Sequence, residues 1–111
     1  MTKLIECTAE VFHRGSVFRA HGRYPYEETV DFMVFETLEE DRRFGLMVTT
    51  GYKAGLRLVH LPAESNEGTF GLSKEWVIAN WAKWIYPDCD VSQVIMFEGY
   101  EPGISVGANL E

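Results

Sequence analysis

The stretch that decides the fold is LSKEWVIANWAKWIYP, residues 72–87, which holds all three tryptophans of the 111-residue chain. Ser73 is a residue type preferred at helix N-caps, and Leu72 before it can pack against Val77 as a hydrophobic staple. Glu75 follows in the first turn, where the helix dipole favours a carboxylate. The sequence therefore predicts a helix that begins directly after Ser73.

The tryptophans of this helix are expected to serve different purposes. Pro87 ends the helix near Tyr86, because proline disfavours helical geometry in the residue before it. At about 100° per residue, one arc of about 120° collects the apolar side chains Val77, Ile78, Trp81, Trp84 and Ile85. Trp81 and Trp84 are therefore predicted to be core residues. Trp76 projects from the polar side, where burial beneath the preceding loop is favoured over exposure to a partner.

A first β-hairpin is predicted around Arg14-Gly15, because alternating segments flank a glycine that suits a tight turn. This register would place carboxylates opposite two arginines of the second segment, Glu10 facing Arg19 and Glu6 facing Arg23. Such cross-strand pairs contribute roughly 0.2–1 kcal/mol each. The line Arg19, His21, Arg23 is therefore better explained by pairing within a sheet than by an anion-binding site.

A second hairpin is predicted over residues 30–51, with the charged tip at residues 39–43. Its apolar side chains fall on both faces, one with Met33, Phe35, Leu46 and Val48, and the other with Phe32, Val34 and Met47. Strands that are apolar on both faces are usually covered on both sides. One helix covers one face, so the second face needs the C-terminal segment, another subunit or a partner.

The order of elements indicates an α+β fold. Further strands are predicted at residues 55–62 and 94–98, which places strands before and after the helix. We expect an antiparallel sheet of about five to six strands packed on one main helix, about residues 74–86. Residues 1–109 are predicted to form a single domain, and Leu110-Glu111 resembles an expression-tag remnant.

Composition limits the classes of partner. The net charge is −7, from 17 acidic and 10 basic residues, which argues against nucleic-acid binding and suits a basic partner. The chain lacks an apolar run of the roughly 18 residues that a membrane helix needs, and its N-terminus does not read as a signal peptide. We therefore expect no membrane association and a cytoplasmic location.

Reactive side chains are sparse and scattered. His13, His21 and His60 lie far apart in the sequence, and no His-x-x-x-His or Cys-x-x-Cys pair is present to bind a metal. Cys89 stands between two aspartates, whose negative charges disfavour a thiolate, so Cys89 is a poor candidate for a nucleophile. The sequence therefore predicts no catalytic, cofactor-binding or metal-binding residues.

The C-terminal half resembles a known family. Residues 76–100 combine Trp-x-x-x-x-Trp-x-x-Trp, then Tyr-Pro-acid-Cys-acid-Val, and then an apolar strand that closes in Gly-Tyr. In these motifs, over about residues 72–102, the chain resembles the immunity protein 45 family of bacterial polymorphic toxin systems. The resemblance implies a cytoplasmic protein that binds and blocks a cognate toxin domain, without catalysis or cofactor. Many such toxins are basic nucleases, which suits an acidic inhibitor.

As a hypothesis, acidic loops and an aromatic anchor would contact that toxin. The predicted partner-binding residues are Tyr26, Glu27, Glu28, Glu39, Glu40, Asp41, Trp76, Asp88 and Asp90. Charge would set the association rate, and the aromatic would supply much of the affinity. Two alternatives remain. A small-molecule-binding domain or small enzyme would use a pocket lined by Tyr24, Tyr26 and His60. A homodimer would bury the second sheet face symmetrically.

Overall fold

The computed structural model describes residues 2–23, 28–68 and 71–100. The predicted tag remnant Leu110-Glu111 and the predicted contact residues Tyr26 and Glu27 lie outside the described residues, as does the side chain of Glu40. The predicted helix and the second predicted hairpin fall within the described ranges.

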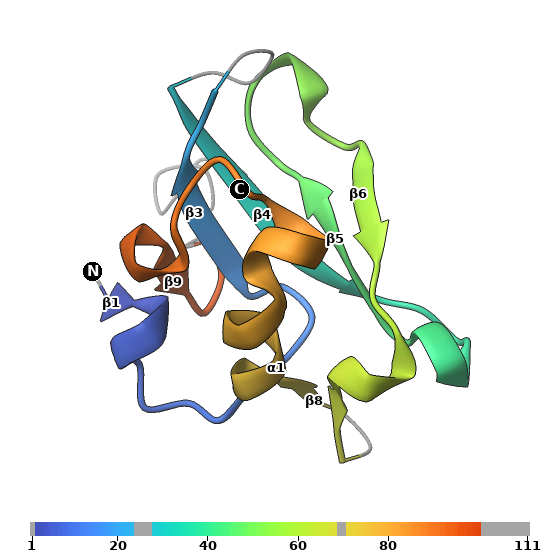
Figure 1. The fold of residues 1–111 in the computed structure, drawn as a ribbon. Coiled ribbons are helices and arrows are strands. Elements are labelled where there is room, and N and C mark those ends of the chain that lie inside the picture. The colour runs from blue at the N-terminus through green and yellow to red at the C-terminus, as the bar shows by residue number, and fades with distance from the viewer. Residues whose placement is uncertain (1, 24–27, 69–70, 101–111) are drawn as a thin grey trace, which may run out of the picture.

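The main element is an antiparallel sheet of six strands (Figure 1). Its order across the sheet is β1 (Thr2–Lys3), β9 (Ile95–Phe97), β3 (Val17–His21), β4 (Thr29–Glu36), β5 (Phe44–Val48) and β6 (Arg57–His60). A smaller sheet joins β2 (Val11–Phe12), β8 (Gly71–Ser73) and β7 (Asn66–Glu67). Short 3-10 turns link these strands: η1 (Leu4–Glu6), η2 (Glu40–Arg42), η3 (Gly51–Lys53), η4 (Ala63–Ser65) and η6 (Val91–Gln93).

The predicted helix is present and starts where the sequence places it. It consists of α1 (Lys74–Asn80) and a π-helical continuation, η5 (Trp81–Ile85). The Ser73 hydroxyl accepts a hydrogen bond from the backbone N–H of Trp76 at 3.1 Å, which confirms the N-cap. Tyr86 has extended backbone geometry, so the helix ends before Pro87 as predicted. The α+β class is therefore confirmed.

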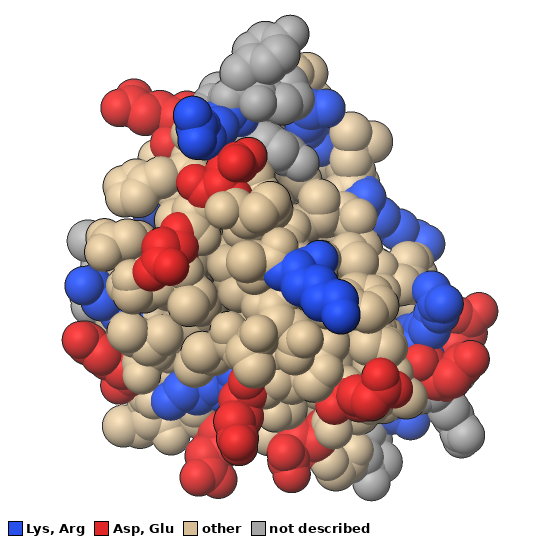
Figure 2. All heavy atoms as spheres, viewed as in Figure 1, with Lys and Arg blue, Asp and Glu red and all other residues tan. Residues whose placement is uncertain are grey.

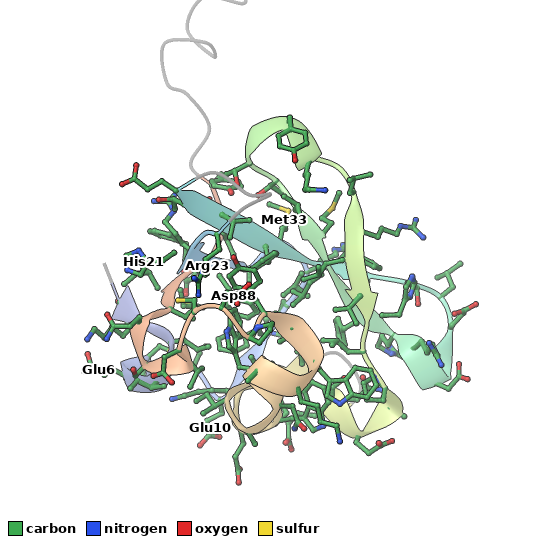
Figure 3. The ribbon with its side chains drawn as sticks, turned by 45° about the horizontal axis from the view of Figure 1, so that its top comes forward. Glu6, Glu10, His21, Arg23, Met33 and Asp88 are labelled. Atoms are coloured by element: carbon green, nitrogen blue, oxygen red, sulfur yellow. The ribbon has the colours of Figure 1, made fainter. Side chains whose placement is uncertain are left out.

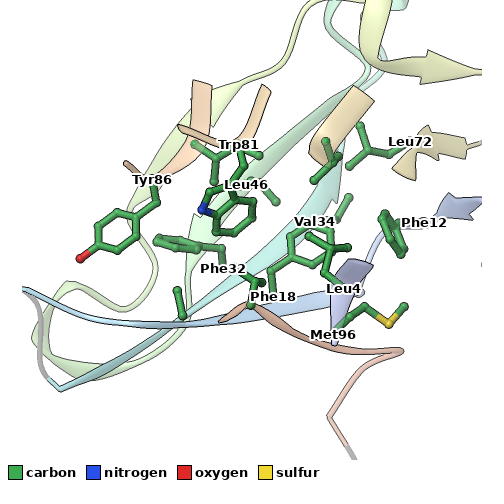
Figure 4. Close-up of a cluster of buried hydrophobic side chains, with 14 of the residues drawn as sticks. Leu4, Phe12, Phe18, Phe32, Val34, Leu46, Leu72, Trp81, Tyr86 and Met96 are labelled. Carbon is green, nitrogen blue, oxygen red and sulfur yellow. The ribbon is translucent and has the colours of Figure 1, made fainter. Parts of the chain in front are cut away.

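The core lies between this helix and one face of the six-stranded sheet (Figures 1 and 4). Trp81 is 1% exposed and meets Phe18 and Phe32 edge-on, with ring centroids 6.0 and 6.3 Å away. Its indole N–H donates to the Cys89 carbonyl at 3.0 Å, so the one polar atom of the ring is satisfied inside the core. Trp81 is a core residue, as predicted.

The first predicted hairpin is wrong beyond its turn. Gly15 has a φ of 93°, and Ser16 N–H donates to the His13 carbonyl at 3.0 Å, so the turn itself is present. However, β2 pairs with β8, while β3 pairs with β4 and β9. Consequently Arg19 lies opposite Asp31 and not Glu10. Tight-turn chemistry specifies a chain reversal, but the pairing beyond it is decided by longer-range packing.

The second hairpin forms, with a different register from the one predicted. Phe32 pairs with Val48 and Val34 with Leu46, and these four side chains are buried in the core. The opposite face takes Met33, Phe35 and Met47. A shift of one residue moves a strand's whole side-chain set to the other face. The loop that contains η2 allows β5 to pair one residue out of the predicted register, so Met47 lies on the same face as Met33.

The remaining strand predictions are confirmed. The segment after Gly55 contains β6, and residues 94–98 contain β9. Among the described residues, no helix has the length and hydropathy that crossing a bilayer requires.

Candidate functional site

The side of the six-stranded sheet opposite α1, called the outer face, is partly apolar. Strand register places one row of side chains across it, Phe97, Val17, Met33, Met47 and Arg57. Val17 is buried, whereas Met33, Met47 and Phe97 are each half-buried. The expectation that the central strands are apolar on both faces is therefore met.

A polar network interrupts this row at its β3–β4 side. Arg19 binds the Asp31 carboxylate with two hydrogen bonds, from Nε at 2.7 Å and from Nη2 at 3.0 Å. The Tyr100 hydroxyl donates to Asp31 Oδ2 at 2.5 Å, and it shares a 2.7 Å hydrogen bond with the Thr49 hydroxyl. Asp31 is 0% exposed, so its charge depends on these partners for compensation.

The same contacts shift two pKa values in directions that support the network. The hydrogen bond to Asp31 raises the pKa of the Arg19 guanidinium. Burial, followed by the hydrogen bond to Asp31, raises the pKa of the Tyr100 phenol. Tyr100 therefore stays neutral and keeps its proton to donate. The network thus ties the chain that follows β9 to strand β4.

The other end of the outer face contains a hollow of about 490 Å³. We call it the β4–β5 hollow, and it is lined by Phe35, Glu36, Thr37, Leu38, Glu39, Met47, Arg57 and His60. His60 packs edge-on against Phe35, with ring centroids 5.3 Å apart, and the Arg57 guanidinium lies 5.3 Å from the Phe35 ring centroid. His60 is thus half-buried on this face.

The predicted acidic loops do not form one patch. Glu28 precedes β4, whereas Glu39 and Asp41 follow it, and all three are exposed. A strand of eight residues separates them, a length of about 26 Å at the usual rise per residue. Of these three acids, Glu39 is the one that lines the β4–β5 hollow.

The two aspartates after the helix lie on the loop between η5 and η6. The Tyr86 hydroxyl, just before this loop, accepts a hydrogen bond from the Arg23 backbone N–H at 2.8 Å. Asp88 is exposed and lies on the same side of the molecule as Arg23 (Figure 3). Asp90 caps η6 by accepting hydrogen bonds from the Ser92 hydroxyl and backbone N–H, which lower the pKa of its carboxyl. Asp90 therefore also has a local structural role.

Trp76 and Trp84 pack against each other on the helix. Both are half-buried, and their ring centroids lie 5.9 Å apart at an interplanar angle of 54°. The π-helical winding accounts for this contact, because its wider turn advances fewer degrees per residue and brings Trp84 back over Trp76. Trp84 packs against the core but is only half-buried, which corrects the prediction that it is a core residue. Trp76 also packs against the core, and part of its side chain stays exposed.

A second hollow, on the helix side, was missed by sequence reasoning. Acidic side chains gather along the lower rim of the face that α1 covers (Figure 2). A hollow of about 440 Å³ is lined by Glu10, Val11, Glu67, Ser73, Lys74, Glu75 and Ile78. Three of these, Glu10, Glu67 and Glu75, are carboxylates from separate segments, and they border the same hollow because β2 and β7 both pair with β8, which directly precedes α1. Only that long-range pairing, which no local pattern encodes, brings them together.

Glu6 lies apart from Arg23, its expected partner (Figure 3).

The described residues offer few groups suited to metal binding or catalysis. Within residues 2–23, 28–68 and 71–100, no cluster of three His, Cys, Asp or Glu side chains is placed to hold a metal ion. Cys7 and Cys89 are free thiols buried in the fold. Of the residues predicted to line a ligand pocket, His60 borders the β4–β5 hollow, while Tyr24 and Tyr26 lie outside the described residues.

These features define a small α+β domain with open, mixed apolar and charged surfaces. Comparison with protein families gives its membership: the family model described as immunity protein 45 matches residues 4–96. The chain belongs to the immunity protein 45 family, which extends the resemblance seen in the C-terminal motifs to the N-terminal strands. No curated protein and no solved structure matches the chain.

Proposed function

We propose that this chain binds a cognate bacterial toxin domain and neutralises it by protein–protein contact, without catalysis or a cofactor, in the cytoplasm. The observation that carries this proposal is the family match, which spans both the sheet and the helix. Membership in an immunity protein family implies a toxin as partner, and polymorphic toxin systems are the setting that the resemblance suggests.

Charge supports a basic toxin, such as a nuclease. The chain carries 17 acidic and 10 basic residues, and exposed carboxylates occur at Glu28, Glu39, Asp41, Asp88 and Asp90. Long-range attraction would speed the encounter with a positively charged surface, and the effect would fall as salt increases. Because these acids lie at separate ends of the fold, we propose that they steer the partner collectively. The sequence-based hypothesis of acidic loops with an aromatic anchor also proposes four further contact residues, Tyr26, Glu27, Glu40 and Trp76.

The test is capture of the toxin from the native bacterium. The tagged chain is expected to retain a large toxin, or its C-terminal fragment, at one-to-one stoichiometry, as identified by mass spectrometry. Expression of that fragment alone should stop growth of a host cell, and co-expression of this chain should restore it. Failure to rescue growth, with both proteins soluble, would contradict the proposal. A different immunity protein expressed at the same level serves as the control.

A further inference from the structure

We propose that the toxin docks on the β4–β5 hollow of the outer face, with an apolar side chain of the toxin against Phe35 and Met47 and basic groups beside Glu39. This inference rests on the proposed function, and it names the surface and the chemistry of the partner that fits it. The hollow adds an apolar anchor apart from Trp76, at a place where apolar and acidic side chains occur together.

The Phe35 side chain, at the floor of the hollow, is held in place by its neighbours. The Phe35 ring covers Gly45, because a Cβ built on that glycine would lie 2.3 Å from Phe35 Cζ. His60 packs against the ring edge and Arg57 lies over the ring. A side chain fixed by three neighbours loses little conformational freedom on binding, so its contact area is converted to affinity efficiently.

The rim adds an apolar group that the fold does not bury. Leu38 lines the hollow and is fully exposed, which makes it the most exposed large hydrophobic side chain among the described residues. Half-buried Phe35 and Met47 line the same hollow. Methionine and aromatic side chains are enriched at protein–protein interfaces. Phe35 and Met47 thus form an apolar centre, and Leu38 extends it onto the rim, where a partner can cover it.

The charges around the hollow favour a basic partner, although Arg57, which lies over Phe35, also lines it. Residues 36–43 carry four carboxylates and two arginines. Glu36 lies 3.9 Å from Arg43, so part of this charge is neutralised within the loop. Glu39 and Asp41 are exposed close to Leu38 in the chain. An apolar centre with an acidic rim matches a toxin surface in which lysine or arginine flanks an apolar projection.

The edges of the six-stranded sheet are less suited to docking. β6 has four residues, pairs with an irregularity between Leu46 and Met47, and exposes Arg57. The other edge, β1, has two residues. Short strands, bulges and edge charges are the features that discourage addition of a further strand. Side-chain contact on a face is therefore favoured over extension of the sheet.

The test uses the captured toxin domain and two matched pairs of substitutions. Leu38→Asp and Glu39→Lys alter the hollow. Ile5→Asp and Glu6→Lys alter an adjacent apolar and acidic pair that is also exposed, on η1 beside the opposite edge of the sheet. Dissociation constants and association rates are measured by surface plasmon resonance at several salt concentrations. Circular dichroism and thermal unfolding establish that each variant is folded.

We expect Leu38→Asp to weaken binding by about 30-fold, the change typical of a hot-spot residue. Glu39→Lys should slow association by several-fold at low salt and reduce its salt dependence. Ile5→Asp and Glu6→Lys should stay within about twofold of the wild type, because they lie outside the proposed contact.

Three outcomes would overturn the inference while leaving the toxin interaction intact. The first is wild-type affinity in folded Leu38→Asp and Glu39→Lys. The second is an equal loss in the η1 variants. The third is a homodimer of the free chain that Leu38→Asp dissociates, which would assign the hollow to a second copy. Failure of the wild-type chain to bind any toxin would instead count against the proposed function.

Discussion

The two faces of the six-stranded sheet are built from alternate residues of the same strands, yet they are stabilised differently. The helix-covered face is continuous apolar packing around Trp81. The outer face combines half-buried Met33 and Phe35 with a fully buried Asp31, whose carboxylate is paired with Arg19 and accepts a hydrogen bond from Tyr100. Both faces therefore contribute to stability, the first through apolar packing and the second through the buried Asp31 network, and the second face also keeps exposed groups that a partner can use.

This difference separates stability from recognition. Truncation in the helix-covered face removes contacts that nothing replaces, because interiors are close-packed. Truncation of an exposed group on the outer face removes contacts that matter mainly when a partner is bound. The loss of unfolding free energy should therefore be large where a substitution removes a buried group or the partner of one, and small where it removes an exposed group.

The largest effect is expected from Trp81→Ala. Removing this buried side chain leaves a cavity, and the Cys89 carbonyl loses its hydrogen bond from the indole N–H. The free energy of unfolding should fall by about 3–5 kcal/mol. Urea denaturation measured by circular dichroism checks this value. A loss below about 1 kcal/mol would mean that the helix does not pack on the sheet as described.

Arg19→Ala should follow, with a loss of about 3 kcal/mol, because it leaves the buried Asp31 charge with fewer partners. Arg57→Ala is the matched control on the same face, since its guanidinium lies over Phe35 and the residue is exposed. Its loss should stay below about 1 kcal/mol. Urea denaturation measures both losses. Equal losses in the two variants would contradict a stabilising role for the ion pair between Arg19 and Asp31.

Gly45→Ala should cost about 2 kcal/mol, because the new methyl would lie 2.3 Å from Phe35 Cζ and 2.6 Å from the Val59 carbonyl oxygen. The ring can move, but the strand backbone of β6 cannot do so freely. Gly99→Ala is the control, as its nearest neighbour would be 3.5 Å away. Thermal unfolding compares the two. A Gly45→Ala protein as stable as Gly99→Ala would contradict the close approach of Phe35.

The smallest effect is expected from Tyr100→Phe, about 1 kcal/mol at neutral pH, from the lost hydrogen bonds to Asp31 and Thr49. The pKa of Tyr100 is raised in the folded state, so its contribution is fully present below the unfolded pKa of about 10. That contribution is lost as pH rises through the raised folded value.

Urea denaturation between about pH 8 and about pH 11 tests this sign, with the range set by the usual tyrosine pKa near 10. The stability difference between wild type and Tyr100→Phe should shrink as pH increases. Tyr52→Phe, at an exposed tyrosine, controls for the loss of a phenol. A difference that grows with pH would contradict the raised pKa.

Local signals in the sequence predicted the elements that local chemistry determines. The Ser73 cap, the helix end before Pro87 and the turn at Gly15 all depend on neighbouring residues, and all three are present. Pairing between distant strands depends on packing energies that no short pattern contains. The segment before Gly15 therefore joined β8 instead of β3.

The candidate site was harder to predict than the fold. The acidic tip at Glu39 was identified from composition, but its neighbours Arg57 and His60 come from β6 and reach it only through the β5–β6 pairing. The sequence placed Met33 and Met47 on opposite faces, whereas the register of β4 and β5 pairs them on the outer face. The apolar row of the outer face was therefore not predicted. Arg19 was expected to have a carboxylate partner, and it has one, but from Asp31.

The tilted Trp76–Trp84 pair gives the molecule an optical signature of its π-helical turn. Two indoles this close, with non-parallel rings, couple their electronic transitions and split one absorption into circular dichroism bands of opposite sign. Trp81, which packs against phenylalanines, lies in a different aromatic environment. The couplet therefore reports local winding of residues 81–85 separately from the global fold, and it would register any rewinding of the helix when a partner is added.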